Sequence, residues 1–145
     1  MNQMAYSIAR LDQARGFADV LGFRQVQWEE GRAVLELELR PYHLNLAGVI
    51  HGGVLMSLLD IVCAQAGLYH PDPSQIRRAV TLSLTTTFTG QASAGVIRAI
   101  GTLRSQGSRI FNSSGEILDD SGRLLAMGEG TFRYRSGRNS AHKEE

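Results

Sequence analysis

The spacing of hydrophobic and polar residues changes several times along the chain, and each change marks a boundary between predicted elements. Near the N-terminus, apolar residues recur at near-helical spacing, which predicts a short amphipathic helix over residues 7–21. Strict alternation in residues 32–40 predicts a half-buried strand. Residues 23–29 are expected to form an antiparallel strand before it, with the turn at Glu30 and Gly31.

An irregular stretch at residues 41–50 precedes the most apolar part of the chain. From about His51 to about Tyr69 the pattern is helical and apolar on nearly every face, which predicts a helix wrapped by other structure. Prolines at positions 71 and 73 end it. Its most apolar part, residues 54–68, is shorter than the roughly 20 residues that a membrane span needs, so we expect no membrane association.

The second half of the chain is strand-like throughout. In residues 80–89 apolar side chains alternate with Thr and Ser, and strands at 96–103, 109–118 and 124–135 follow. Turn residues at 106–107 and 120–122 suit antiparallel hairpins, and the polar tail at 136–145 is predicted to be disordered. Two strands, one buried helix and four strands in a meander make an α+β architecture, in one domain over residues 1–145.

Composition and charge argue against several classes of function. The chain of 145 residues is 43% apolar and 20% charged, as in ordinary soluble proteins, and its formal charge of +1 gives no electrostatic case for nucleic acid or an anionic membrane. The single cysteine, Cys63, lies in an apolar run and is predicted to be buried and inert, and no metal-binding group of Cys and His is present. Residues 1–11 do not have the pattern of a signal peptide, so the cytoplasm is the expected location.

One motif carries a resemblance to a known family. Asn45 stands six residues before His51, Gly52 and Gly53 follow directly, and Asp60 stands nine residues after His51. The order of the predicted elements and the sequence of residues 122–132 match the same family. Together with the motif, they make residues 20–135 resemble the phenylacetic-acid-degradation-type (PaaI-like) thioesterases of the hotdog superfamily. The resemblance implies an antiparallel sheet wrapped around one central helix, and hydrolysis of acyl-CoA thioesters without a metal or other cofactor.

The resemblance also implies roles for individual residues. The acid on the helix, here Asp60, acts as nucleophile or as general base. The backbone N–H of the first glycine after the histidine, here Gly52, polarises the thioester carbonyl, and Asn45 positions water or substrate. A hydroxyl residue on the third strand is usual in the animal members, and Thr81 is the nearest match.

The residues themselves leave alternatives open. Asp60 is the only ionisable residue between Gly52 and Gly67, and a buried carboxylate either shifts its pKa or finds a partner, so it is either functional or bonded to neighbouring strands. Gly52 and Gly53 either offer free N–H groups to a ligand or simply permit a tight entry into the helix. His51 either holds the loop or touches the substrate.

Three residues near a predicted hairpin, Arg104, Ser105 and Arg109, are candidates for binding the CoA phosphates. Their alternative role is to keep an exposed turn soluble. The apolar surroundings expected for the acyl group fit both phenylacetyl-type and medium-chain groups.

Helix geometry predicts a shared site. Residues 51 and 60 are nine apart, which puts them about half a turn out of phase and about 13 Å apart along the axis. Gly52 and Asp60 of one chain are therefore not expected to face the same carbonyl. We expect a homo-oligomer, either a dimer or a dimer of dimers, in which Gly52 of one chain meets Asp60 of its partner.

Two rival functions fit a similar fold. A non-catalytic acyl-CoA-binding protein would have no use for Asp60. A hotdog enoyl-CoA hydratase is expected to place an Asp and a His together near the helix start, whereas His51 and Asp60 are out of phase.

Overall fold

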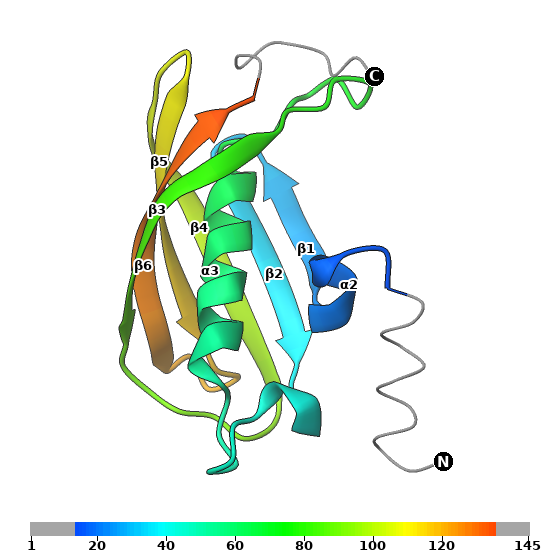
Figure 1. The fold of residues 1–145 in the computed structure, drawn as a ribbon, viewed down its shortest axis with the longest axis vertical. Helices are drawn as coiled ribbons and strands as arrows, with labels where there is room; N and C mark the ends of the chain where they lie inside the picture. The colour runs from blue at the N-terminus through cyan, green and yellow to red at the C-terminus, as the bar shows by residue number, and fades with distance from the viewer. Residues whose placement is uncertain (1–13, 136–145) are drawn as a thin grey trace.

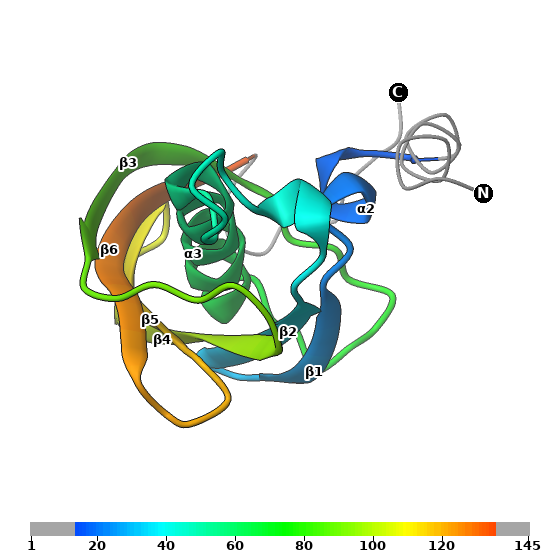
Figure 2. The same ribbon diagram turned by 90° about the horizontal axis from the view of Figure 1, so that it is seen from below.

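The structure, a computed structural model, describes residues 14–135, in which one antiparallel sheet curls around one long helix (Figures 1 and 2). This arrangement confirms the predicted α+β hotdog architecture. The elements in chain order are α2 (Phe17–Leu21), β1 (Arg24–Glu29), β2 (Arg32–Glu38), the 3-10 helix η1 (Pro41–His43), α3 (Gly52–Ala66), β3 (Ala79–Phe88), β4 (Val96–Gln106), β5 (Ile110–Leu118) and β6 (Leu124–Tyr134).

The structure covers only part of the elements predicted near the two ends of the chain. Of the helix predicted over 7–21, the structure describes α2, which begins after Gly16 and ends before Gly22. The rest of that predicted helix, up to residue 13, and the tail at 136–145 lie outside the described residues. The central helix ends at Ala66, three residues before the predicted Tyr69.

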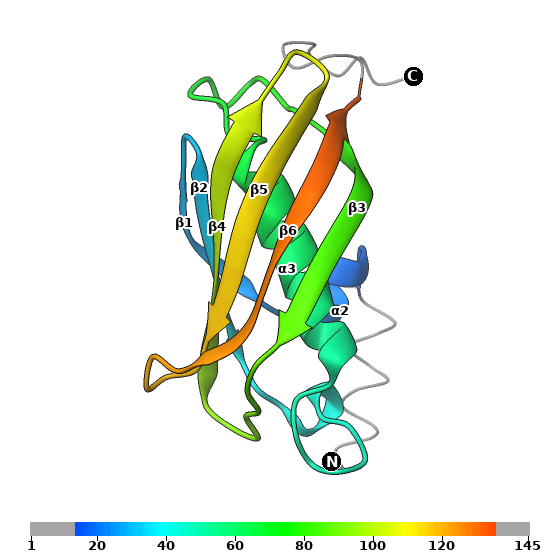
Figure 3. The same cartoon turned by 90° about the vertical axis from the view of Figure 1, so that its left-hand side faces the viewer.

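The order of the strands corrects the predicted meander. Across the sheet the order is β1-β2-β4-β5-β6-β3, and all neighbours are antiparallel (Figure 3). Only β4, β5 and β6 form a meander, whereas β3 pairs with β6 and forms the far edge. The long connection over residues 89–95 lets the chain cross from one edge back to β2, so sequence neighbours β3 and β4 are not sheet neighbours.

Helix α3 lies close to the middle of the sheet because the strands beneath it carry very small residues. Ala33, Gly101, Gly115 and Gly128 are cross-strand neighbours from β2 to β6 and form one row across the sheet. A Cβ at Gly101 would overlap the backbone oxygen of Val62 in α3. Side chains at this point of the row would therefore push the helix away from the sheet.

Within one chain the sheet covers one side of α3. The buried side packs on the sheet and consists of Leu55, Leu58, Leu59, Val62, Cys63 and Ala66. On the open side Met56 is 39% exposed and Asp60 is half-buried. No helix of the described residues is both long and apolar enough to cross a membrane.

A β-bulge changes the faces of strand β3. Simple alternation would put Thr81 and Ser83 on the same face, but the pairing with β6 shifts between them, at Leu82. Thr81 pairs with Phe132, a buried residue of the core, whereas Ser83 pairs with Thr131 beside it. The bulge therefore turns Thr81 toward α3 while Ser83 faces away from it.

Candidate active site

Asp60 lies on the open side of α3 and is held there by a strand residue. Thr81 of β3 donates a hydrogen bond from Oγ1 to Asp60 Oδ1 at 2.6 Å. Among the described residues Asp60 forms no salt bridge, and the bond to Thr81 ties its carboxylate to the sheet. The structure thus joins the two residues that the sequence proposed as carboxylate and strand hydroxyl, and it leaves Oδ2 available for a ligand.

The first turn of α3 leaves one backbone donor unused. His51 is the N-cap, and its Nδ1 accepts a hydrogen bond from the Gly53 N–H at 2.8 Å. The N–H groups of Val54 and Leu55 both donate to the His51 carbonyl. Within the described part of the chain the Gly52 N–H makes no hydrogen bond, so it remains free at the positive end of the helix dipole.

His51, Gly52 and Gly53 differ in the hydrogen bonds that they make. His51 holds the loop as a cap, and its contact with substrate stays a prediction. The Gly53 N–H is occupied by that cap, and a Cβ at Gly53 would stand only 3.0 Å from His51 Nδ1, so this glycine makes room for the ring. Of the three, Gly52 is the one whose backbone N–H makes no hydrogen bond in the described part of the chain.

Phe88, which the sequence did not single out, lies beside that donor. A Cβ at Gly52 would stand 3.4 Å from Phe88 Cε1, so the aromatic ring borders the backbone at the start of α3. The ring is about half exposed. No sequence signal indicated this contact, because it joins the end of β3 to a residue 36 positions earlier in the chain.

Gly52 and Asp60 do not converge within one chain. Helix α3 is continuous from Gly52 to Ala66, and Asp60 stands eight positions after Gly52. At 1.5 Å per residue this is about 12 Å along the axis. Their angular offset is about 80°, smaller than the half turn between His51 and Asp60, so the axial distance is what keeps them apart.

Asn45 shapes the loop before α3. Its Oδ1 accepts hydrogen bonds from the N–H groups of Ala47 at 2.9 Å and Val49 at 3.2 Å. Its backbone N–H donates to the Val49 carbonyl, which closes a tight turn. The structure does not bring Asn45 into contact with Asp60, and its predicted role toward water or substrate stays a prediction.

Comparison with known proteins then identifies the family. The sequence profile of the thioesterase superfamily matches residues 47–126, which include Gly52, Asp60 and Thr81. The chain belongs to the thioesterase superfamily. It is a thioester hydrolase with the hotdog fold.

Individual relatives agree with this placement. The chain is 30% identical to a proposed esterase of Saccharolobus solfataricus, over 85% of this chain and 84% of that protein. It is 30% identical to the phenylacetic acid degradation protein PaaI of Thermus thermophilus, with a TM-score of 0.70 over 81% of this chain and 96% of that one. A thioesterase of Haemophilus influenzae shares the fold, with a TM-score of 0.77, 17% identity and coverage of 93% and 92% of the two chains.

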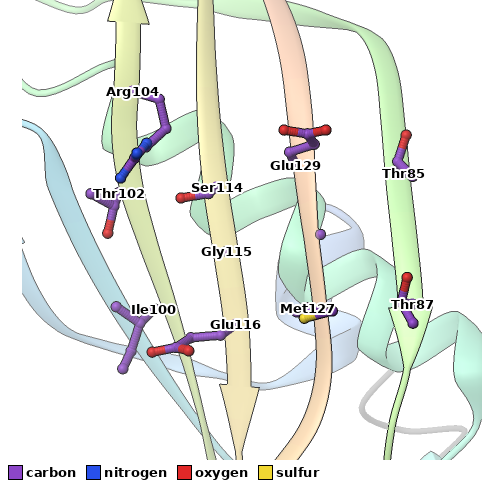
Figure 4. Close-up of a pocket in the computed structure, with 11 residues that line it drawn as sticks. Thr85, Thr87, Ile100, Thr102, Arg104, Ser114, Gly115, Glu116, Met127 and Glu129 are labelled. Carbon is purple, nitrogen blue, oxygen red and sulfur yellow. The ribbon is translucent and has the colours of Figure 1, made fainter.

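The arginines expected to bind CoA lie away from Asp60 of the same thioesterase chain. Arg104 lines a hollow of about 520 Å³ with Thr85, Glu116 and Glu129, on the sheet face opposite α3 (Figure 4). Ser105 and Arg109 are exposed near the β4–β5 turn. The structure does not bring this group together with Asp60 of the same chain, and its contact with CoA stays a prediction.

The cysteine of this thioesterase is buried beneath the carboxylate. Cys63 is fully buried, and burial first and the charge of Asp60 second raise the pKa of its thiol from 9.0 to about 12. The thiol therefore stays protonated at neutral pH, as expected of an inert core residue. Within residues 14–135, no three His, Cys, Asp or Glu side chains are grouped as metal ligands would be.

Proposed function

We propose that this thioesterase hydrolyses acyl-CoA, with an aryl or medium-chain acyl group, to the free acid and CoA. The observation that carries the proposal is the Asp60 carboxylate on the open side of α3, bonded to Thr81 through one oxygen only. A carboxylate held in this way has a fixed orientation, and its second oxygen remains available to act as a base or a nucleophile.

The free Gly52 N–H supports the electrophilic half of the mechanism. It would donate to the thioester carbonyl oxygen and stabilise the negative charge that develops there when the carbonyl carbon is attacked. Since this donor is fixed at the start of a helix, it needs no reorganisation during the reaction.

Asp60 supplies either a base or a nucleophile. In the first route it takes a proton from water, the hydroxide adds to the carbonyl carbon, the C–S bond breaks, and the proton passes to the CoA sulfur. In the second route Asp60 attacks the carbonyl carbon, the C–S bond breaks, and CoA leaves as a thiolate that takes a proton from water; water then hydrolyses the acyl-aspartyl anhydride. Label in the protein after single-turnover hydrolysis in ¹⁸O-water identifies the second route, because water that adds to the aspartyl carbon of the anhydride leaves its oxygen in Asp60. Neither route requires a metal, so EDTA should leave kcat unchanged.

We further propose that the site is completed by a second copy of the chain. Gly52 and Asp60 are about 12 Å apart along one helix, which is too far to act on one carbonyl. Strand β3 is an edge strand, and three of its apolar side chains, Val80, Leu82 and Phe88, are about half exposed. Such an edge is a ready template for pairing. Antiparallel pairing of two β3 strands about a two-fold axis would set Gly52 of one chain toward Asp60 of the other.

A panel of acyl-CoA substrates with a thiol reagent tests the activity. Release of free CoA at a rate that depends on Asp60 is the expected result. Binding without turnover would instead favour an acyl-CoA-binding protein, and water addition to an enoyl-CoA would favour a hydratase. The ranking of kcat/KM across the panel identifies the preferred acyl group.

A further inference from the structure

A buried histidine outside the machinery described above lies close to the start of α3. His43, in η1, is only 3% exposed. Its Nδ1 accepts a hydrogen bond from the Arg40 N–H at 2.9 Å, so in this neutral ring the proton is on Nε2. Nε2 therefore donates to the Leu21 carbonyl at 2.7 Å. The ring thus caps the start of η1 at Arg40 and fastens η1 to the last residue of α2.

The backbone of His43 continues this anchor toward the helix. Its carbonyl accepts a hydrogen bond from the His51 N–H at 2.9 Å. Leu44 and Ile50 form a β-bridge just inside that bond, so residues 43–51 make a closed loop whose two ends meet at His43. Gly52 follows His51 directly, which leaves one hydrogen bond and one peptide link between the anchored residue and the free donor.

We propose that His43 is a positioning residue that holds the Gly52 N–H in place for the thioester carbonyl. The proposal rests on the function proposed above, in which that N–H stabilises the developing oxyanion. A donor of this kind acts only within about 2.7–3.1 Å of the oxyanion, and a misplacement of about 1 Å can cost roughly 10²-fold in rate. A buried ring with both nitrogens bonded is well suited to prevent such movement.

Two conservative variants each remove one of the two ring bonds. His43→Asn keeps an acceptor near Nδ1 for the Arg40 N–H and loses the link to Leu21, whereas His43→Gln keeps a donor that reaches toward Leu21 and loses the acceptor. We expect kcat to fall about tenfold in each, with KM within about twofold, since an oxyanion donor acts mainly in the transition state.

A matched control separates positioning from a general loss of stability. Tyr134→Phe removes two hydrogen bonds of another buried side chain near the opposite end of α3: Tyr134 Oη donates to the Gly67 carbonyl at 2.6 Å and accepts from Gln106 Nε2 at 2.6 Å. This variant should lower Tm by an amount comparable to the His43 variants while leaving kcat near the wild-type value.

The combination with Gly52→Pro, which removes the N–H itself, completes the test. If His43 acts through this donor, His43→Asn should cause no further loss of kcat in the Gly52→Pro background. Loss of Tm with wild-type kcat in both His43 variants would overturn the proposal, as would an undiminished tenfold loss in the Gly52→Pro background. Failure of the proposed function is distinguishable, because Gly52→Pro alone would then keep the wild-type kcat.

Discussion

Gly52→Pro tests the proposed oxyanion donor with little other disturbance, because of the place that Gly52 occupies. It is the first residue of α3, a position where proline is common and where the lost N–H has no partner within the helix. The preceding residue, His51, has φ −65° and ψ 133°, the extended conformation that proline requires before it. The variant therefore removes a donor that the described part of the fold does not use.

The expected effect is large on catalysis and small on stability. Loss of one oxyanion donor typically lowers kcat about 10²–10³-fold, or about 2.7–4 kcal/mol of transition-state stabilisation. Replacement of a residue by proline in a compatible conformation changes the free energy of unfolding by only about 0.4–1 kcal/mol, and in the stabilising direction. The measurements are steady-state release of CoA, and the urea midpoint of the same preparation.

Gly52→Ala is the matched control. It keeps the N–H and adds a Cβ at 3.4 Å from the Phe88 ring, which is an ordinary van der Waals contact. We expect its kcat to stay within a few-fold of wild type. A folded Gly52→Pro protein with kcat within about threefold of Gly52→Ala would refute the assigned role of the Gly52 N–H.

Three further predictions follow from the same geometry. Asp60→Asn should leave folding and CoA binding largely intact while kcat falls about 10²–10⁴-fold, and a variant that kept more than about a tenth of the wild-type kcat would remove Asp60 from its role. Mixing Asp60→Asn with Gly52→Pro should restore about a quarter of wild-type activity after random subunit exchange, because half the dimers would carry one intact site of two; verified exchange without recovery would favour a site within one chain. Because the pKa of Cys63 is raised from 9.0 to about 12, its contribution to stability is full below pH 9 and declines between pH 9 and 12 as the unfolded thiol ionises. Relative to Cys63→Ala, the wild type should therefore lose about 2 kcal/mol in urea unfolding between pH 8 and pH 10.5.

Local periodicity was sufficient to predict most elements of this fold. The change from period two to a helical repeat identified α3, and alternation, strand-favouring composition and turn residues together identified six strands with boundaries near the observed ones. The order of the strands was not predictable in this way, because the pairing of β3 with β6 joins residues such as Ala79 and Tyr134 that are far apart in the sequence. Alternation states which face a residue takes but not which strand lies beside it.

The candidate site was predictable where a motif marked it and not elsewhere. Asp60, Gly52 and Thr81 were found from the resemblance, and the contact between Asp60 and Thr81 agrees with it. Strict alternation groups Thr81 with Ser83, however, and only the bulge at Leu82 separates them. His43 carried no chemical pattern of its own, because its importance depends on burial and on bonds to Leu21 and Arg40.

The row of small residues beneath α3 sets the distance between the helix and the sheet, and with it the position of the Asp60 carboxylate. Gly101 faces the Val62 carbonyl on the side of α3 that packs on the sheet, so a methyl group there would lift α3 by something on the order of 1 Å. Asp60 would rise with the helix while Thr81 stayed in the sheet, and their 2.6 Å hydrogen bond would stretch beyond use. Substitutions in this row would therefore lower the activity without contacting the substrate. Inherited or engineered changes of activity are to be sought in this row as well as around Asp60.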